Sequence, residues 1–188
     1  MTSIRNNGGD REERYLDAAR ESILAVGWRR STLTDVAKRA GVSRMTIYRR
    51  WPDMQTLLAD LLVREWGRVV DPALQSDASL RDGIVTTVSA LREDPLFRRI
   101  VDVDPEVLLP YLLDRRGRNQ DRVLGLLVAA VERGQQEGTV RAGDPRRMAS
   151  ALMLALQGFL VSARTMPELS LEQLDEELGE LVERYLRR

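Results

Sequence analysis

Apolar residues recur along this chain with the three- and four-residue spacing of helices, and no segment of useful length alternates apolar and polar positions as a strand does. The first apolar stripe keeps to one helical face: Leu16, Ala19, Ile23 and Val26. We expect its helix to begin with Asp10 as the cap and to end at Gly27, where a left-handed residue is wanted. The pattern predicts an all-α fold.

Caps, glycines and prolines divide the rest of the chain into further helices. We expect these at about 32–40, 44–51, 54–69, 80–93, 119–136, 145–165 and 171–188. Asp144 followed by Pro145, and Ser170 followed by Gln173, are the strongest start signals. Three prolines interrupt the apolar region 95–114, which we therefore expect to form one or two short or kinked helices.

Two of the short helices are joined by a tight turn within residues 32–51, TLTDVAKRAGVSRMTIYRRW. Ala37 is small enough for the helices to cross closely, Gly41 permits a positive φ at the turn, and Ser43 caps the second helix. Three apolar residues are expected to point inward and hold the crossing angle: Val36, Val42 and Ile47. This pattern is typical of a helix-turn-helix, which places its second helix in the major groove of DNA. An ordinary helical hairpin with a solvated arginine face is the alternative.

The stretch GVSRMTIYRRWPDMQTLLADLL resembles the N-terminal domain of the TetR family of one-component transcriptional regulators, and the resemblance covers about residues 12–66. An aromatic residue after the recognition helix, here Trp51, is typical of that family. The sequence departs from the family at Met54, where a phosphate-contacting lysine is common.

The resemblance implies an N-terminal three-helix helix-turn-helix DNA-binding domain and a C-terminal helical domain for ligand binding and dimerisation. We accordingly divide the chain into three parts. Residues 1–9 are expected to form a disordered arm, residues 10–52 the DNA-binding domain, and residues 53–188 the regulatory and dimerisation domain.

Eight residues are candidates for contact with a double-stranded DNA operator: Thr32, Thr34, Arg44, Met45, Thr46, Tyr48, Arg49 and Arg50. Arg44 and Thr46 are candidates for base edges, since arginine on guanine is the commonest specific contact; contact with the backbone alone is the alternative. In the family the residue matching Tyr48 typically touches a phosphate, whereas a buried tyrosine is the alternative. Thr32 is either a phosphate ligand or only a helix cap.

Helix-turn-helix proteins normally pair and read two half-sites, and in TetR relatives the last two long helices form the dimer interface. Here those helices span about 145–165 and 170–187, the first with a stripe of small residues and the second with a seam of larger apolar ones. The predicted homodimer interface consists of Ala151, Ala155, Gly158, Ser162, Leu174, Leu178, Leu181 and Tyr185. Packing of both faces within one subunit is the alternative.

Members of the family commonly bind a small-molecule effector among the middle helices, in largely apolar pockets with a few polar anchors. The candidate pocket residues are Trp66, Thr87, Leu91, Phe97, Tyr111, Leu127 and Gln157. Gln157 stands out, because its amide lies in the apolar run ALMLALQGFL and needs a partner in the ligand or in the second subunit. The alternative for the others is a place in the ordinary core.

The distribution of charge strengthens the DNA-binding interpretation. The chain has 29 basic and 29 acidic residues, yet residues 1–50 carry a net charge of +5 and residues 51–188 one of −5. A basic segment on an acidic body points to a nucleic-acid partner. All but one of the basic residues are arginines, which suit bidentate contact with guanine and phosphate.

Missing residue types exclude several classes of chemistry. The chain contains no Cys and no His, so it has no disulfide, thiol nucleophile, imidazole metal site or Ser-His-Asp triad. We expect no metal, no cofactor and no catalytic residue. An all-α carboxylate enzyme would use Asp102, Asp104 and Glu106, but a helix start at Asp104-Pro105-Glu106 explains these acids.

The longest near-continuous apolar run, at 123–131, is well short of the roughly 20 residues of a membrane span. The N-terminus is polar and has no signal core, so we expect a cytoplasmic protein without a membrane partner. These features predict a ligand-responsive repressor that binds a palindromic operator as a homodimer. A constitutive or architectural DNA-binding protein without an effector is the alternative.

Overall fold

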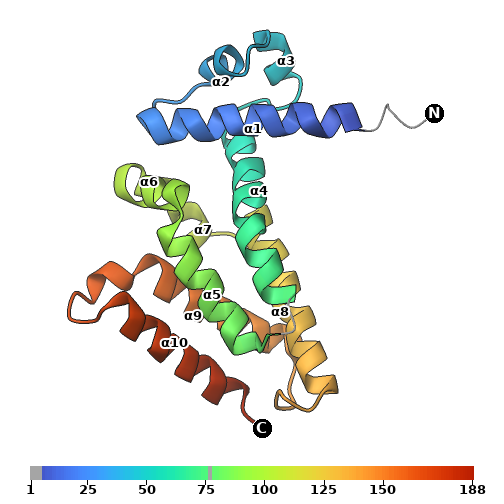
Figure 1. The fold of residues 1–188 in the computed structure, drawn as a ribbon, viewed down its shortest axis with the longest axis vertical. Helices are drawn as coiled ribbons and strands as arrows, with labels where there is room; N and C mark the ends of the chain where they lie inside the picture. The colour runs from blue at the N-terminus through green and yellow to red at the C-terminus, as the bar shows by residue number, and fades with distance from the viewer. Residues whose placement is uncertain (1–5, 76–77) are drawn as a thin grey trace. The chain divides into compact units, whose positions relative to one another are not determined.

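The computed structural model describes residues 6–75 and 78–188, and this part of the chain contains helices and no strands (Figure 1). The helices are α1 (Asn6–Val26), α2 (Leu33–Arg39), α3 (Arg44–Tyr48), α4 (Met54–Gln75), α5 (Leu80–Glu93), α6 (Pro95–Val103), α7 (Leu109–Leu113), α8 (Arg118–Gln136), α9 (Pro145–Val161) and α10 (Leu171–Leu186). Two 3₁₀ turns, η1 (Pro105–Val107) and η2 (Ala163–Thr165), lie between them. The all-α prediction is confirmed.

The chain forms two compact units. The first comprises the chain up to residue 65 together with residues 95–110, and the second comprises residues 66–94 and 111–188. The chain therefore passes between the units at three points, and the compact units do not divide at residue 52, where we placed the domain boundary. Every helix among the described residues is too short or too polar to cross a lipid bilayer.

Helix boundaries follow the local signals in the sequence where a cap is present. Asp144 accepts a hydrogen bond from the Arg147 amide at 2.9 Å, as an N-cap ahead of a first-turn proline does. At the start of α10, the Ser170 hydroxyl accepts from the Gln173 amide at 3.2 Å, and the Gln173 side chain accepts from the Ser170 amide at 2.8 Å. This is the reciprocal capping box expected from the sequence.

Three boundaries differ from the prediction. Helix α1 begins at Asn6, so residues 6–9 of the predicted arm are helical, since extending an existing helix costs far less than nucleating one; residues 1–5 lie outside the described part. Helix α3 ends at Tyr48, three residues before its expected end. Helix α4 continues beyond Val69 because Val70 and Leu74 are buried on either side of Pro72, which itself lies exposed in the last turn.

The core of the second unit is assembled from α4, α5, α8, α9 and α10. Helix α8 packs on α9, and α5 packs on both α9 and α10. Leu127, Leu152 and Leu178 are each no more than 1% exposed, and burial of one such side chain contributes about 1.5–3 kcal/mol. Hydrophobic burial therefore fixes the relative positions of these helices.

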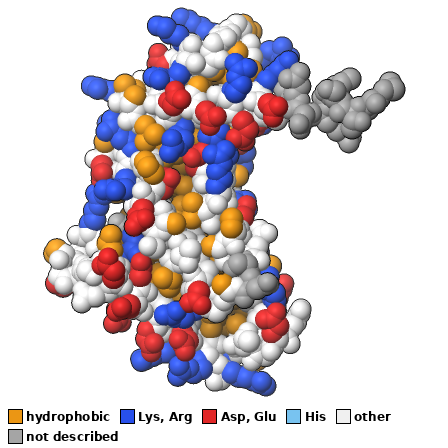
Figure 2. Space-filling model, viewed as in Figure 1, with side chains coloured by type: hydrophobic (Ala, Val, Ile, Leu, Met, Phe, Trp, Pro, Cys, Tyr) orange, Lys and Arg blue, Asp and Glu red, His pale blue; other side chains and the backbone are white. Residues whose placement is uncertain are grey.

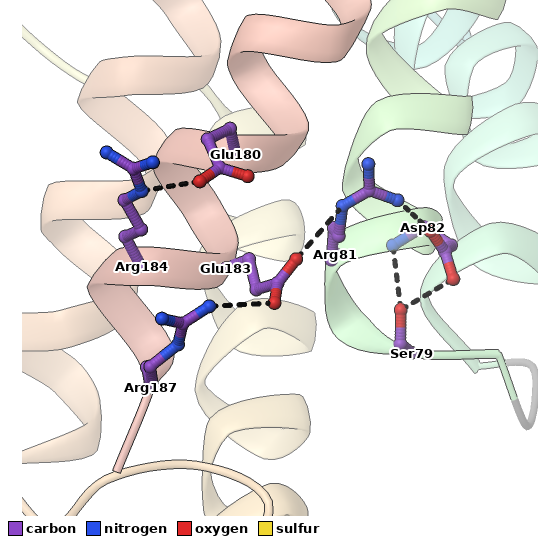
Figure 3. A network of polar contacts seen from close by, with 7 residues as sticks. All are labelled: Ser79, Arg81, Asp82, Glu180, Glu183, Arg184 and Arg187. Atoms are coloured by element: carbon purple, nitrogen blue, oxygen red, sulfur yellow. Dashed lines mark hydrogen bonds and ion pairs between the residues drawn. The ribbon is translucent and has the colours of Figure 1, made fainter.

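A polar network crosses from α5 to α10 at the edge of this core (Figure 3). Arg81 of α5 lies 2.6 Å from the carboxylate of Asp82 and 3.8 Å from that of Glu183 on α10. Glu183 in turn pairs with Arg187 at 3.2 Å. The Arg81 guanidinium lies over Gly179, where a Cβ would be only 2.7 Å from its Nη2 atom. The absence of a side chain at Gly179 thus makes room for the arginine.

A substitution at Gly83 tests how tightly the second unit is packed. A Cβ added at Gly83 would stand 2.5 Å from the backbone carbonyl oxygen of Ala73, which cannot move as a flexible side chain can. Gly83→Ala is therefore expected to lower the free energy of unfolding by about 1–3 kcal/mol in urea denaturation. In α8, Gly125 has nothing within 4 Å, so the control Gly125→Ala should raise it by about 0.5–1 kcal/mol. Equal effects of the two substitutions would contradict the packing described.

Candidate nucleic-acid interface

The first unit contains a helix-turn-helix built from α2 and α3 and supported by α1 (Figure 1). We call α1, α2, α3 and residues 54–65 of α4 the head. Ala37 is 1% exposed, and its carbonyl accepts a hydrogen bond from the Val42 amide at 3.0 Å across the turn. Gly41, between them, has φ of +68°, which glycine adopts without the strain of a side chain. The crossing predicted from Ala37 and Gly41 is therefore present.

Helix α3 exposes one face and buries the other. Ser43 caps it by accepting from the Thr46 amide at 3.2 Å, and Ile47 is fully buried. On the opposite face Met45 is 68% exposed and Tyr48 is 47% exposed. The alternative of a buried Tyr48 is thereby excluded. Arg44 and Arg49 are also exposed.

A short helix of this kind depends on its anchors, and Trp51 is the largest of them. Its side chain is fully buried, and its indole Nε1 donates to the carboxylate of Asp60 on α4 at 2.7 Å. The ring of Tyr15 on α1 meets the Trp51 ring edge-on, with centroids 6.2 Å apart. Trp51 therefore joins the segment after α3 to both α1 and α4.

Ion pairs hold α4 against α1 beneath the helix-turn-helix. The Arg64 side chain of α4 is 8% exposed and lies 2.9 Å from Asp17 and 3.2 Å from Glu13, both on α1. Glu65, also 8% exposed, pairs with Arg20 of α1 at 3.1 Å. Since both signs of charge are paired, this cluster avoids the large cost of an isolated buried charge.

Arg50 is engaged within the head. Its Nε and Nη2 atoms donate to the two carboxylate oxygens of Glu12 on α1, at 3.1 and 2.7 Å. This fork raises the pKa of the Arg50 guanidinium above its ordinary value, and the same group lies over the Trp51 ring at 5.4 Å. From the sequence we grouped Arg50 with the DNA-facing arginines. Its pairing with Glu12, 38 residues earlier in the chain, could not be predicted from any local pattern.

Two of the three threonines of the predicted interface, Thr32 and Thr46, take part in helix caps. Thr32 caps α2 by accepting from the Asp35 amide at 3.1 Å, and its hydroxyl donates to the Asp35 carboxylate at 2.6 Å. The Thr46 hydroxyl lies 2.9 Å from that of Ser43, and Thr46 and Thr34 are half-buried. At the start of α4 the Thr56 amide donates to Asp53 and lowers the pKa of its carboxyl. Met54, next to it, is half-buried.

Basic side chains gather over the part of the head formed by α2 and α3 (Figure 2). Beside the arginines of α3, Arg30 before α2 and Lys38 within α2 are exposed. Arg39 is partly neutralised by Glu21, at 3.5 Å. The exposed face of α3 thus combines cations, a phenol and an apolar side chain, which are the groups that bind phosphates and base edges.

Sequence reasoning missed the role of Asp104. We assigned Asp104-Pro105-Glu106 to a helix start, and η1 does begin at Pro105, but the Asp104 side chain makes no cap bond there. Its carboxylate instead accepts hydrogen bonds from the Trp28 and Arg29 amides, 76 and 75 residues earlier in the chain. No local pattern reveals a partner at that separation.

The predicted dimer residues divide into two groups. Ala151 and Gly158 lie exposed on α9, Ser162 is exposed directly after its end, and Ala155 is half-exposed. On α10, Leu181 is 44% exposed, whereas Leu174 and Leu178 are buried at 6% and 0% in their own chain. Tyr185 is half-buried beneath Arg141, whose guanidinium lies 4.8 Å from the ring centroid.

The prediction for Leu174 and Leu178 is therefore corrected: they face the core of their own chain because α10 packs on α5. Leu154, 71% exposed on α9, was missed.

The predicted pocket residues are not all in one unit. Leu91 and Leu127 lie in the core of the second unit, with Trp66 packed against it. Thr87 is 5% exposed, and its hydroxyl donates to the Gly83 carbonyl at 2.7 Å. Tyr111 and Gln157 are half-buried in the same unit. Phe97, 4% exposed, belongs to the first unit, so the structure does not place it with the others.

Comparison with known proteins agrees with the geometry of the head. Residues 16–61 match the family model described as bacterial regulatory proteins, tetR family. An HTH-type transcriptional regulator of Mycobacterium tuberculosis is 35% identical over 166 residues, which is 87% of each chain, and one of Mycobacterium bovis is equally similar. The regulator YhgD of Bacillus subtilis is 22% identical over 77% of this chain and 79% of its own length.

Solved structures share the fold over nearly the full chain. The TetR-family repressor QsdR of R. erythropolis superposes with a TM-score of 0.68 at 18% identity, covering 94% of each chain. The TetR-family repressor AlkX of a Dietzia strain gives 0.64 at 23% identity, covering 93% of this chain and 94% of its own. SmeT, in a complex with triclosan, gives 0.64 at 22% identity over 95% and 92%. The relatives from Mycobacterium and Bacillus are described as HTH-type transcriptional regulators, and QsdR and AlkX as TetR-family repressors.

The anchor of α3 can be tested by removing the acceptor of the Trp51 indole. Asp60→Ala should lower the free energy of unfolding by about 1–3 kcal/mol, because it leaves a buried N–H donor without its partner. Asp60→Asn keeps one acceptor oxygen and should cost less. Asp114→Ala, at an exposed acid, should change it by less than about 0.5 kcal/mol in the same urea titration. Wild-type stability in Asp60→Ala would refute the anchoring role.

Proposed function

Since the chain belongs to the TetR family of helix-turn-helix transcriptional regulators, we propose that it is a repressor that reads a palindromic DNA operator with the exposed face of α3. The observation that carries the proposal is the two-sided nature of this helix. Ile47 is fully buried, while Met45 and Tyr48 of the same helix are largely exposed. A surface rich in basic side chains surrounds it (Figure 2).

Specific roles follow from the exposure and chemistry of each side chain. We assign Arg44 to a base edge in the major groove, where its fork matches guanine, and Met45 to a thymine methyl group. Tyr48 and Arg49 are assigned to phosphates, together with Thr32 and Thr34 at the start of α2. Arg50 already pairs with Glu12, so it contributes less direct contact than the sequence suggested.

The proposed homodimer forms through the exposed apolar and small residues in the second half of α9. Leu154 is 71% exposed, and Gly158 one turn further has no atom of its own chain within 4 Å of a Cβ position. Small residues let a second helix approach closely, and Leu154 would then be covered. Leu181 on α10 is 44% exposed, and we include it in the proposed interface. A two-fold pair would present two α3 helices to two half-sites.

We further propose that the second unit binds a largely apolar small molecule that changes DNA affinity. SmeT was solved with triclosan, and the Dietzia repressor AlkX is implicated in biodegradation of n-alkanes, which supports an apolar effector for this fold. Gln157 and Thr87 are the polar candidates for anchoring it. A compound that shifts both the unfolding temperature and the operator affinity supports this role; a constitutive DNA binder would respond to none. Because a DNA operator is reached inside the cell, we also propose a cytoplasmic location.

Phosphate contacts can be tested with an operator selected from random DNA. Arg49→Ala should weaken binding and reduce the slope of log affinity against log salt concentration by about 0.9, because one phosphate contact is lost. Tyr48→Phe should raise Kd by about threefold to tenfold through loss of one hydrogen bond. Fluorescence anisotropy at several salt concentrations measures both quantities. Arg187→Ala, directly after α10, is the control and should leave both quantities unchanged. Salt-independent binding by wild-type protein would contradict the proposal.

The dimer can be tested by placing a charge on the exposed glycine of α9. Gly158→Glu has room within its own chain, but a second helix packed there would bury the carboxylate, so the variant should run as a monomer. Gly125→Glu on α8, which also has nothing within 4 Å, is the matched control and should remain a dimer. Light scattering after gel filtration gives the mass of each. A dimeric Gly158→Glu would place the interface elsewhere.

A further inference from the structure

We propose that Asp104 is a positioning residue for DNA binding, because it holds the turn between α1 and α2 in the conformation in which the head meets DNA. The proposal rests on the proposed DNA-binding function and deepens it. Asp104 lies outside the segment that matches the family model, residues 16–61, and far from it in sequence. It acts through the backbone of that turn and does not itself face the exposed side of α3.

The Asp104 carboxylate is buried and its hydrogen bonds go to main-chain amides. It is 2% exposed, and its Oδ2 atom accepts from the Trp28 amide at 2.6 Å. Its Oδ1 atom lies 3.4 Å from the Arg29 amide, a longer bond. A carboxylate is retained in such a place only when hydrogen bonds compensate its lost hydration. These two successive amides are therefore tied to Asp104.

Two serines also hold the turn. The Ser31 hydroxyl donates to the Gly27 carbonyl at 2.8 Å and lies 3.0 Å from the Ser22 hydroxyl of α1, and both serines are buried. Gly27 has φ of +87°, and a Cβ at this position would be 2.9 Å from Oδ2 of Asp104. The serine pair and the aspartate therefore both bond to the turn, and the aspartate leaves no room for a side chain at Gly27.

The fixed turn leads directly into the DNA-facing elements. Thr32, the residue after Ser31, is the cap of α2. Helix α2 in turn fixes α3 through the bond from the Val42 amide to the Ala37 carbonyl, at 3.0 Å. A shift of the turn therefore moves the amides at the start of α2 and the crossing that orients α3. Arg29, exposed in the same turn, also pairs with Glu106.

Asp104 is itself held rigidly on the head. Its amide donates to the Ile100 carbonyl at 2.9 Å, and its carbonyl accepts from the Val107 amide at 3.0 Å. Leu96, Phe97 and Ile100 are at most 4% exposed, and α6 packs on α1. Residues 95–110 accordingly belong to the same compact unit as the head. The carboxylate is supplied by a segment with its own hydrophobic attachment, so it can act as a fixed support.

The test compares Asp104→Asn with Asp102→Asn, a substitution at an exposed acid on the same segment. The asparagine keeps one acceptor but loses the charge and places an NH₂ group toward an amide. We expect about a tenfold rise in Kd for the selected operator, calculated per active molecule from a stoichiometric titration well below the unfolding temperature. The salt slope should change less than in Arg49→Ala, because the substitution removes no cationic side chain. Asp102→Asn should bind within about twofold of wild type.

Gly27→Ala gives a second, independent disturbance of the same contact from the side of the turn. Gly27→Ala should raise the operator Kd as well. When it is combined with Asp104→Ala, the rise in Kd of the double variant should be smaller than the product of the two single rises, because both substitutions act on one contact. Amide hydrogen exchange should accelerate at Trp28 and Arg29 in Asp104→Asn.

Two outcomes would overturn the proposal. One is an Asp104→Asn protein that is less stable but binds the operator with wild-type Kd per active molecule, since Asp104 would then be merely structural. The other is an equal rise in Kd for Asp102→Asn, which would mean that loss of any acid on this segment, and not the bonds from Asp104 to the turn, accounts for the effect. Failure of the proposed function itself is distinguishable, because wild-type protein would then select no operator at all.

Discussion

The burial of Ile47 and Trp51 is the interaction on which the rest of the head depends. Helix α3 has only five residues, and a helix that short does not persist in water because its first turn fixes the backbone of three residues for a single hydrogen bond, and too few further bonds follow to offset that cost. Its shape and direction therefore come from tertiary packing: Ile47 and Trp51 are fully buried, and the Trp51 indole is fixed to Asp60. The same packing leaves Tyr48 and its neighbours facing outward. The burial of Ile47 and Trp51 thus both anchors α3 and turns Tyr48 toward solvent.

The head is also a composite of segments far apart in the sequence. The helix-turn-helix is supported by α1, which is joined to α4 by ion pairs. Residues 95–110 belong to the same compact unit. The chain passes between the two units at three points, so α4 is not the only covalent link between them. The effector proposed for the second unit would therefore have more than one covalent connection through which to act on the head, if it bound one arrangement more tightly than another.

The parts of the structure that depend on local chemistry could be predicted from the sequence. Ser43, Asp144 and Ser170 cap their helices as expected, and Gly41 takes the positive φ that its place in the turn requires. The exposed face of α3 followed from the same reasoning.

Features that depend on long-range contacts could not be predicted. Asp104 and Arg50 find partners 76 and 38 residues away, with no periodic signal in between. Leu174 and Leu178 fit a seam on α10, but a helical stripe does not say whether it faces the core of its own chain or a second copy. The extension of α4 past Pro72 was missed for a related reason, since the tertiary burial of Val70 and Leu74 outweighed the local proline signal.

The central claim is that the exposed face of α3 reads DNA sequence, and parallel selection from random DNA with wild-type and Arg44→Ala proteins tests it most directly. Wild-type protein should enrich a palindrome whose half-sites lie about one helical turn apart. Arg44→Ala should enrich the same palindrome with the preference for one guanine lost at the matching position of both half-sites. An identical motif from both proteins, or no enriched motif from wild-type protein, would contradict the account.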